Sequence, residues 1–327
     1  MSIGGFVSFF ALFTRRSGSS GKQRERNVTN KISVPNVIFI LIFAILINTN
    51  NALSITFGDY EKVLKGSQKI EIEGISPGDG KELEAYLYKP KGKGPFPALI
   101  ALHGAGGIFP YQLWWAKEIS KKGYVVLFID HYCTRDLLCE VKSDDEDQAR
   151  GEIMRNWQEV SPRQRVLDAV AGYSWLSEEV YIDKSKIGLI GWSWGGAAAM
   201  FAQKIARRLS LPNGGFKATI AFYPNLKFVL DKPQWTKTGP IEQPTLILYG
   251  KYDILESEQA YETLLSAGYS GEIKVVGFDK AYRKFDELGP YREKNHPSVG
   301  DFGKAFQQKA FDLSRKEIDK FLSQHFR

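Results

Sequence analysis

The sequence has no apolar run long enough for a membrane span. Its longest run, residues 37–47, holds eleven apolar residues, whereas a spanning helix needs about 20. Such a run is typical of the core of a secretion signal, and the stretch before it is basic and rich in serine and glycine. We therefore predict a signal peptide at residues 1–52 and export of the remainder to the periplasm or the extracellular space. Residues 48–52 form a poor cleavage site, so an uncleaved anchor that holds the protein at a membrane is the alternative.

The rest of the chain also lacks a strong excess of charge of one sign. The formal net charge is +7, but residues 1–52 carry +5 of it, which leaves +2 for residues 53–327. A nucleic-acid-binding domain would show a clustered positive field, and the sequence contains no nucleic-acid-binding motif. We therefore expect no nucleic-acid partner.

Cysteine and histidine are scarce, which restricts both metal binding and acid–base catalysis. The two cysteines, Cys133 and Cys139, are separated by five residues. They can form a disulfide in an oxidising compartment or remain free thiols, and their spacing alone does not decide between the two. No cluster of side chains has the spacing of metal ligands, so we expect no bound metal. The four histidines are His103, His131, His296 and His325.

After residue 53, short apolar runs alternate with longer amphipathic stretches, without internal repeats or a long linker. Six runs have the character of strands buried on both faces: 98–102, 125–129, 187–190, 218–222, 245–249 and 273–276. Helical patterns cover 111–122, 161–178, 194–208, 255–267 and 304–325. Residues 70–72 and 83–87 alternate in polarity, which predicts an antiparallel edge hairpin. The sequence thus predicts one α/β domain over residues 53–327, with a mostly parallel, doubly wound sheet and helices on both faces.

The last predicted helix has an apolar stripe. We expect its buried face to contain Phe306, Ala310, Leu313, Ile318 and Leu322.

A strand, a sharp turn and a helix are predicted around Gly191–Gly195, which reads Gly-Trp-Ser-Trp-Gly. In this context the turn projects the hydroxyl of Ser193 above the sheet, at the N-terminus of a helix, as a nucleophile requires. The backbone N–H of Trp194 and the helix dipole can stabilise an oxyanion there. The stretch His103–Gly107 follows an earlier strand, and its small residues can supply a second oxyanion N–H, which we assign to Ala105.

An acidic residue follows the predicted strand 245–249. Asp253 lies in the turn after this strand and downstream of Ser193, where the residue that orients a catalytic histidine belongs. Aspartate is also common in turns for local reasons, so the assignment depends on its combination with the Ser193 turn.

From about residue 82 to 325 the chain resembles the dienelactone hydrolase family of α/β-hydrolases. The matching segments, in the order and spacing of the family, are His103–Gly107, Asp130 with Arg135, Gly191–Gly195, Phe222–Pro224 and Gly250–Asp253. The resemblance implies the α/β-hydrolase fold and a serine or cysteine nucleophile that acts on esters or lactones through an acyl-enzyme. It also implies no cofactor, and a small-molecule ester or lactone as the substrate.

One position departs from that family. Its members carry the histidine in a stretch like Ala-Tyr-His-x-Phe-Asp, whereas residues 281–286 read Ala-Tyr-Arg-Lys-Phe-Asp. The guanidinium of Arg283 has a pKa above about 12 and cannot accept the serine proton near neutral pH. His296 lies in a loop after Asp253, so we predict it as the base, although it can also be an ordinary loop residue. The alternative is a catalytically silent binding protein in which Arg283 forms a buried ion pair with Asp253.

Overall fold

The structure is a computed structural model that describes part of the chain: residues 63–76, 82–135, 137, 151, 155–156, 158–206, 208–230, 239–253, 255–267, 271–287 and 300–326. The predicted signal peptide, the predicted base His296 and the cysteine Cys139 lie outside these residues. Cys133 is disulfide-bonded, and no cysteine of the described part is free. Among the described residues, no helix combines the length and the apolar character needed to cross a membrane.

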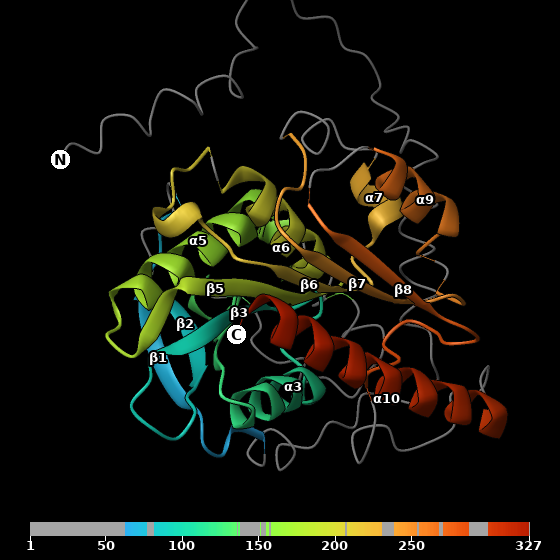
Figure 1. Cartoon of the computed structure of the whole chain (residues 1–327), viewed down its shortest axis with the longest axis horizontal. Helices are drawn as coiled ribbons and strands as arrows, with labels where there is room; N and C mark the ends of the chain where they lie inside the picture. Colours follow the sequence, from blue (N-terminus) through green and yellow to red (C-terminus); the bar gives the residue numbers. More distant parts are fainter. Residues whose placement is uncertain are drawn as a thin grey trace, which may run out of the picture. The chain divides into compact units, whose positions relative to one another are not determined.

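Eight strands of the described chain form one sheet in the order β1-β2-β4-β3-β5-β6-β7-β8 (Figure 1). They are β1 (Gln68–Glu73), β2 (Glu82–Tyr88), β3 (Phe96–Leu102), β4 (Val125–Ile129), β5 (Ile182–Trp192), β6 (Thr219–Phe222), β7 (Thr245–Gly250) and β8 (Ile273–Phe278). The β1–β2 and β2–β4 pairs are antiparallel, and every other pair is parallel. The predicted edge hairpin and the mostly parallel sheet are therefore confirmed.

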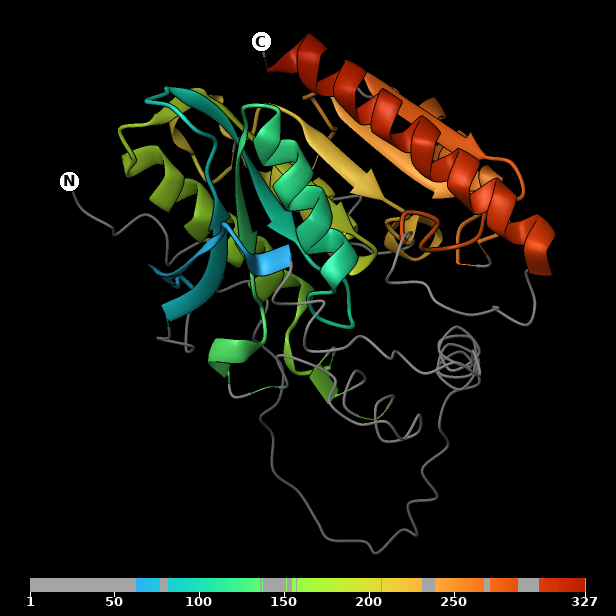
Figure 2. The same ribbon diagram turned by 90° about the horizontal axis from the view of Figure 1, so that it is seen from below.

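Helices cover both faces of the sheet. They are α3 (Pro110–Lys121), α5 (Pro162–Glu178), α6 (Trp194–Ile205), α7 (Leu226–Leu230), α9 (Glu258–Ser266) and α10 (Gly300–His325), with short 3₁₀ turns η3 (Cys133–Arg135) and η4 (Pro212–Gly214). Figures 1 and 2 show α5 and α6 on one face and α3 and α10 on the other. This is the doubly wound α/β arrangement that the alternating pattern predicts.

Local sequence signals account for several of these elements. The central strands are continuous apolar runs because helices cover them on both sides, and Ile100, Leu127 and Leu189 have no exposed surface. Helix α5 begins after Ser161, whose Oγ accepts the backbone N–H of Gln164 at 3.2 Å. Such caps satisfy backbone donors that the first turn of a helix leaves free.

The predicted apolar face of α10 is wrong at one position. Ala310, Ile318 and Leu322 are buried as expected, but Leu313 keeps 38% of its surface exposed and Ser314 is buried instead. At 3.6 residues per turn, residue 314 lies almost above residue 310, whereas residue 313 is turned away from that face. The side chain of Phe306 is not among those described.

The topology determines where a site can form. Strands β3 to β8 run parallel to one another, so the loops after β3, β5, β6, β7 and β8 all leave from the same edge of the sheet. In open α/β sheets this carboxyl edge is the usual location of binding and catalytic residues. All the predicted site residues that the structure describes come from these loops.

Candidate active site

Ser193 lies in a sharp turn between β5 and α6. It is the N-cap residue of α6, with φ 54° and ψ −119°. This backbone conformation is rare for a residue with a side chain, and such strain persists only where the surroundings impose it. The predicted strand–turn–helix geometry is therefore present around this serine.

Two glycines make the turn possible. A Cβ atom on Gly191 would lie 2.3 Å from the carbonyl oxygen of Gly195. One on Gly195 would lie 2.0 Å from the carbonyl oxygen of Leu102, at the end of β3. Both distances are far below van der Waals contact, so the chain needs glycine on each side of Ser193 to bring β3, β5 and α6 together.

The loop after β3 contacts the serine. A Cβ atom on Gly104 would lie 3.3 Å from Ser193 Cβ and 3.9 Å from Ser193 Oγ. Ala105, the predicted oxyanion residue, follows directly and is buried. Trp194, the other predicted oxyanion residue, is the first residue of α6. The structure therefore brings Ser193 and both predicted donors to one place.

Asp253 lies in the turn after β7 and is 4% exposed. Its Oδ1 accepts the backbone N–H of Leu255 at 3.0 Å. The loop of residues 281–286 packs against this turn, since the backbone N–H of Tyr252 donates to Ala281 O at 2.9 Å. A Cβ atom on Gly250 would lie 2.4 Å from the same oxygen. The close approach places residue 283 between Asp253 and Ser193.

Arg283 joins Asp253 to Ser193. Its Nη1 donates to Asp253 Oδ2 at 2.7 Å, and its Nη2 donates to Ser193 Oγ at 2.6 Å. Nη2 also donates to the backbone oxygen of Tyr223 at 3.1 Å. The ion pair that the sequence suggested as an alternative is thus present, and the guanidinium makes the two contacts that a catalytic histidine would make.

The charges around Arg283 keep it protonated. Burial by itself would lower the pKa of its guanidinium, but the carboxylates of Asp253 and Glu256 outweigh burial and raise that pKa above its ordinary value. Glu256 Oε1 lies 3.6 Å from Nη1. Burial also raises the pKa of Glu256, with a further contribution from Asp253 and an opposing one from Arg283. Arg283 therefore donates hydrogen bonds and does not act as a base.

The histidines of the described residues form no hydrogen bond with Ser193. The ring of His103 contacts Gly104 and the backbone of His131, and His131 Nδ1 lies 2.7 Å from Asp168 Oδ2. His325 is at the end of α10. His103 is thus part of the buried structure, with none of its surface exposed. The assignment of His296 as the base stays a prediction because that residue lies outside the described part.

Trp192 anchors the turn in the core. Its ring stacks between Phe128 and Phe222, at centroid distances of 5.8 and 5.3 Å. Its Nε1 donates to Asp286 Oδ2 at 2.7 Å, and Asp286 Oδ1 accepts from the hydroxyl of Tyr223 at 2.7 Å. The residue before Ser193 is therefore hydrogen-bonded to the loop that carries Arg283.

Sequence reasoning missed the role of Asp286 and of Glu256. Asp286 is the last residue of the stretch 281–286, which resembles the histidine-containing stretch of the family. This position was the sequence signal that could have pointed to Asp286. Glu256 accepts the backbone N–H groups of Asn225 and Leu226 and the hydroxyl of Tyr261. No short motif marks Glu256, because its backbone partners Asn225 and Leu226 lie about 30 positions away in the chain.

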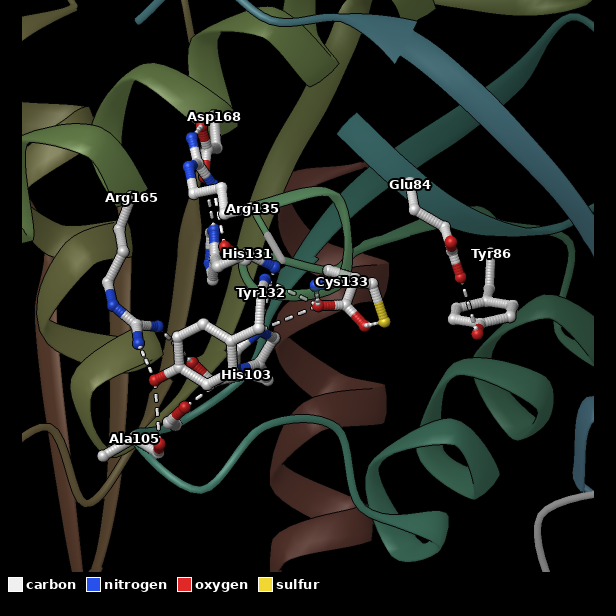
Figure 3. Close-up of polar contacts among 12 residues, drawn as sticks. Glu84, Tyr86, His103, Ala105, His131, Tyr132, Cys133, Arg135, Arg165 and Asp168 are labelled. Atoms are coloured by element: carbon white, nitrogen blue, oxygen red, sulfur yellow. Dashed lines mark hydrogen bonds and ion pairs between the residues drawn. The ribbon is translucent and has the colours of Figure 1, made fainter. Parts of the chain in front are cut away.

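Asp130 and Arg135, which carry part of the family resemblance, have different partners. Asp130 Oδ1 accepts the backbone N–H groups of Tyr132 at 2.7 Å and Cys133 at 3.1 Å. Arg135 binds both carboxylate oxygens of Asp168, at 2.9 and 2.8 Å. Figure 3 shows Arg135 on the Asp168 carboxylate, next to His131, which binds the same carboxylate.

Comparison with known proteins identifies relatives. A model of the dienelactone hydrolase family matches residues 83–286. A thiohydrolase of Aspergillus aculeatus is 30% identical over 134 residues, a match that covers 41% of this chain and 37% of that protein. The chain thus spans well under half the length of this curated relative.

Solved structures share the fold. An esterase of Thermogutta terrifontis superposes with a TM-score of 0.53 at 18% identity, covering 80% of this chain and 95% of the esterase. A dienelactone hydrolase-like promiscuous phosphotriesterase from metagenomic libraries gives a TM-score of 0.56 at 16% identity, covering 80% and 98%. At these identities the likeness concerns the fold.

Proposed function

The chain belongs to the dienelactone hydrolase family, a family of hydrolases, and we propose that it cleaves carboxylic esters or lactones through an acyl-enzyme on Ser193. Ser193 Oγ attacks the carbonyl carbon while its proton passes to a base. The base then protonates the leaving alkoxide, and water, deprotonated by the same base, releases the acid. The N–H groups of Ala105 and Trp194 hold the oxyanion in both steps.

The conformation of Ser193 carries this proposal. Its positive φ of 54° serves to project the hydroxyl at the carboxyl edge of the sheet, beside the loop of Gly104 and at the start of α6. Backbone strain of this kind clusters at sites of chemistry. The buried carboxylate of Asp253 is separated from the Ser193 hydroxyl by the guanidinium of Arg283, which donates a hydrogen bond to each.

The proposed reaction requires Arg283 to release Ser193. While Nη2 donates to Ser193 Oγ, no base can occupy that side of the hydroxyl. His296 is our candidate for the base, and it must reach Ser193 Oγ once Arg283 has moved. In that state Asp253 can orient the imidazole as it now orients the guanidinium.

Activity and labelling of the purified protein test the proposal. We expect hydrolysis of p-nitrophenyl acetate and covalent labelling by a fluorophosphonate, both lost in Ser193→Ala and reduced at least about 100-fold in His296→Ala. His325→Ala, at the far end of α10, is the matched histidine control and should retain wild-type rates. Wild-type turnover that survives His296→Ala would exclude His296 as the base, and turnover that survives Ser193→Ala would exclude the acyl-enzyme.

A second candidate, a catalytically silent binding protein, is favoured by the contact of Arg283 with both Asp253 and Ser193. Under this alternative the wild type gives neither turnover nor labelling. Arg283→His, which places an imidazole between the same two partners, should then gain both, whereas Arg283→Gln should gain neither. Labelling of the wild type at Ser193 would contradict the silent alternative.

A further inference from the structure

Three consecutive carbonyl groups of the loop after β3 are held by buried side chains. His103 O accepts from Arg165 Nη1 at 3.2 Å, and Ala105 O accepts from the Tyr132 hydroxyl at 2.8 Å. Between them, Gly104 O lies 2.7 Å from the Nδ1 atom of His103. Figure 3 shows the His103 ring, Tyr132 and Arg165 converging on this loop. Each of these carbonyls is therefore held by a buried side chain, and Gly104 O also accepts the backbone N–H of Gly107 at 3.4 Å.

The direction of the middle carbonyl determines the direction of an N–H group. The carbonyl of Gly104 and the N–H of Ala105 belong to the same peptide, which is planar and trans, so they point in opposite directions. A hydrogen bond from His103 to this carbonyl therefore turns the Ala105 N–H away from the imidazole. Gly104 itself contacts Ser193.

The surroundings of His103 fix which ring nitrogen carries the proton. Its Nε2 accepts the backbone N–H of His131 at 3.0 Å, so Nδ1 is the donor to Gly104 O. Burial lowers the pKa of His103 well below its ordinary value, and the neighbouring His131 and Arg165 lower that pKa further. The neutral ring has one donor and one acceptor, and this site uses both.

We propose that His103 is a positioning residue that aims the Ala105 N–H at the oxyanion formed on attack by Ser193, with Tyr132 and Arg165 holding the neighbouring carbonyls. This inference rests on the proposed function. It assigns the histidine of the loop to transition-state stabilisation, a role separate from proton transfer.

Tyr132 and Arg165 form one unit with the loop. The Tyr132 hydroxyl donates to Ala105 O and accepts a hydrogen bond from Arg165 Nη2. Both side chains are fully buried, with 0% and 1% of their surface exposed. A hydrogen-bonded unit that is shielded from water keeps a single arrangement, which preorganisation of an oxyanion site requires.

Variants at residue 103 separate this role from simple packing. His103→Leu removes the donor, whereas His103→Asn keeps an N–H at the position of Nδ1. We expect kcat for p-nitrophenyl acetate to fall about 100-fold in His103→Leu with KM changed less than about threefold, because the lost donor acts on the transition state. His103→Asn should recover most of kcat.

Tyr132→Phe tests the support of the loop in a nearly isosteric variant. It removes one hydroxyl, and we expect kcat to fall about tenfold at nearly constant KM. Tyr173→Phe removes a buried hydroxyl that binds Pro212 O, remote from the Ser193 turn, and is the matched control with wild-type kcat. If His103→Leu does not fold, the kcat values of His103→Asn and Tyr132→Phe test the proposal instead. A wild-type kcat in Tyr132→Phe, with KM raised or unchanged, would overturn the proposal.

Crystal structures of the same variants provide a readout that needs no activity. In His103→Leu we expect the Gly104–Ala105 peptide to rotate, and in His103→Asn to keep its wild-type orientation. An unchanged peptide in His103→Leu would overturn the inference. If the wild type shows neither turnover nor labelling, the proposed function fails, yet the orientation of this peptide still decides the role of His103.

Discussion

Arg283 is a largely buried cation surrounded by acceptors. It donates to a carboxylate, a hydroxyl and a carbonyl, from Asp253, Ser193 and Tyr223. Its side chain is 12% exposed, and that of Asp253 is fully buried. An ion pair of this kind stabilises the fold little more than apolar side chains would, but removing one partner leaves a buried charge without compensation. As long as Asp253 is present, the stability of the fold therefore depends on Arg283.

Arg283→Met should destabilise the fold, because it keeps the volume of the side chain and removes its charge. We expect the free energy of unfolding to fall by about 3–5 kcal/mol, measured by urea denaturation at pH 7. Adding Asp253→Asn to the same chain removes the uncompensated carboxylate and should restore part of the loss. A loss below about 1 kcal/mol in the single variant would show that water reaches Asp253.

At the scale of elements, the turn between β5 and α6 fixes how strands and helix meet. The helix starts against the end of β3 because Gly195 has no Cβ atom. Gly195→Ala places that atom 2.0 Å from Leu102 O, so α6 must move away from β3.

We expect Gly195→Ala to lower the free energy of unfolding by about 3 kcal/mol or more, measured by thermal or urea denaturation. Gly151→Ala is the matched control, since a Cβ atom there has no neighbour within 4 Å. Its effect should stay within about 0.5 kcal/mol. Equal midpoints for the two variants would mean that the turn has room for a side chain.

The sequence predicted the central elements and the local part of the site, since these depend on neighbouring residues. Apolar runs marked the strands, and the pattern around Ser193 marked the turn. The start of β5 at Ile182 was missed because residues 183–186 are mostly polar, and a strand of this kind is recognised only through its partners.

The long-range part of the site could not be predicted from local patterns. Arg283 was recognised as a departure, and its pairing with Asp253 was one alternative, but its contact with Ser193 joins residues 90 positions apart. The hydrogen bonds that hold the carbonyls of the loop after β3 depend on the side chains of Tyr132, in the loop after β4, and Arg165, in α5. Such contacts follow from packing, which short motifs do not encode.

At the scale of the whole molecule, buried carboxyl groups make the stability depend on pH. Burial raises the pKa of Asp130 and of Asp286 to about 6, against 3.8 for the free side chain, although hydrogen bonds to each carboxylate oppose the rise. Between about pH 4 and 6 these groups hold protons in the folded chain that they lose in the unfolded chain. Their contribution to stability therefore falls as pH rises through this window and stays low above it.

Asp286→Asn should flatten this dependence because it removes one of the buried carboxyl groups whose pKa is raised. We expect the loss of stability between pH 4 and 7 to shrink by about 3 kcal/mol relative to the wild type, measured by urea denaturation across that range. Asp312→Asn, an exposed carboxylate on α10, should leave the slope unchanged. If the free energy of unfolding of Asp286→Asn changes with pH as it does in the wild type, groups other than Asp286 cause the pH dependence.

The position of Arg283 also has a genetic consequence. A histidine codon and an arginine codon can differ by a single base, and the backbone of residues 281–286 is held by Gly250, Tyr252 and Trp192 whichever side chain stands at 283. Where codon 283 is CGU or CGC, a gene that encodes this chain can therefore move between a proton-accepting and a permanently cationic site in one mutational step. A library restricted to codon 283, selected for growth on an ester as the carbon source, would sample that step directly.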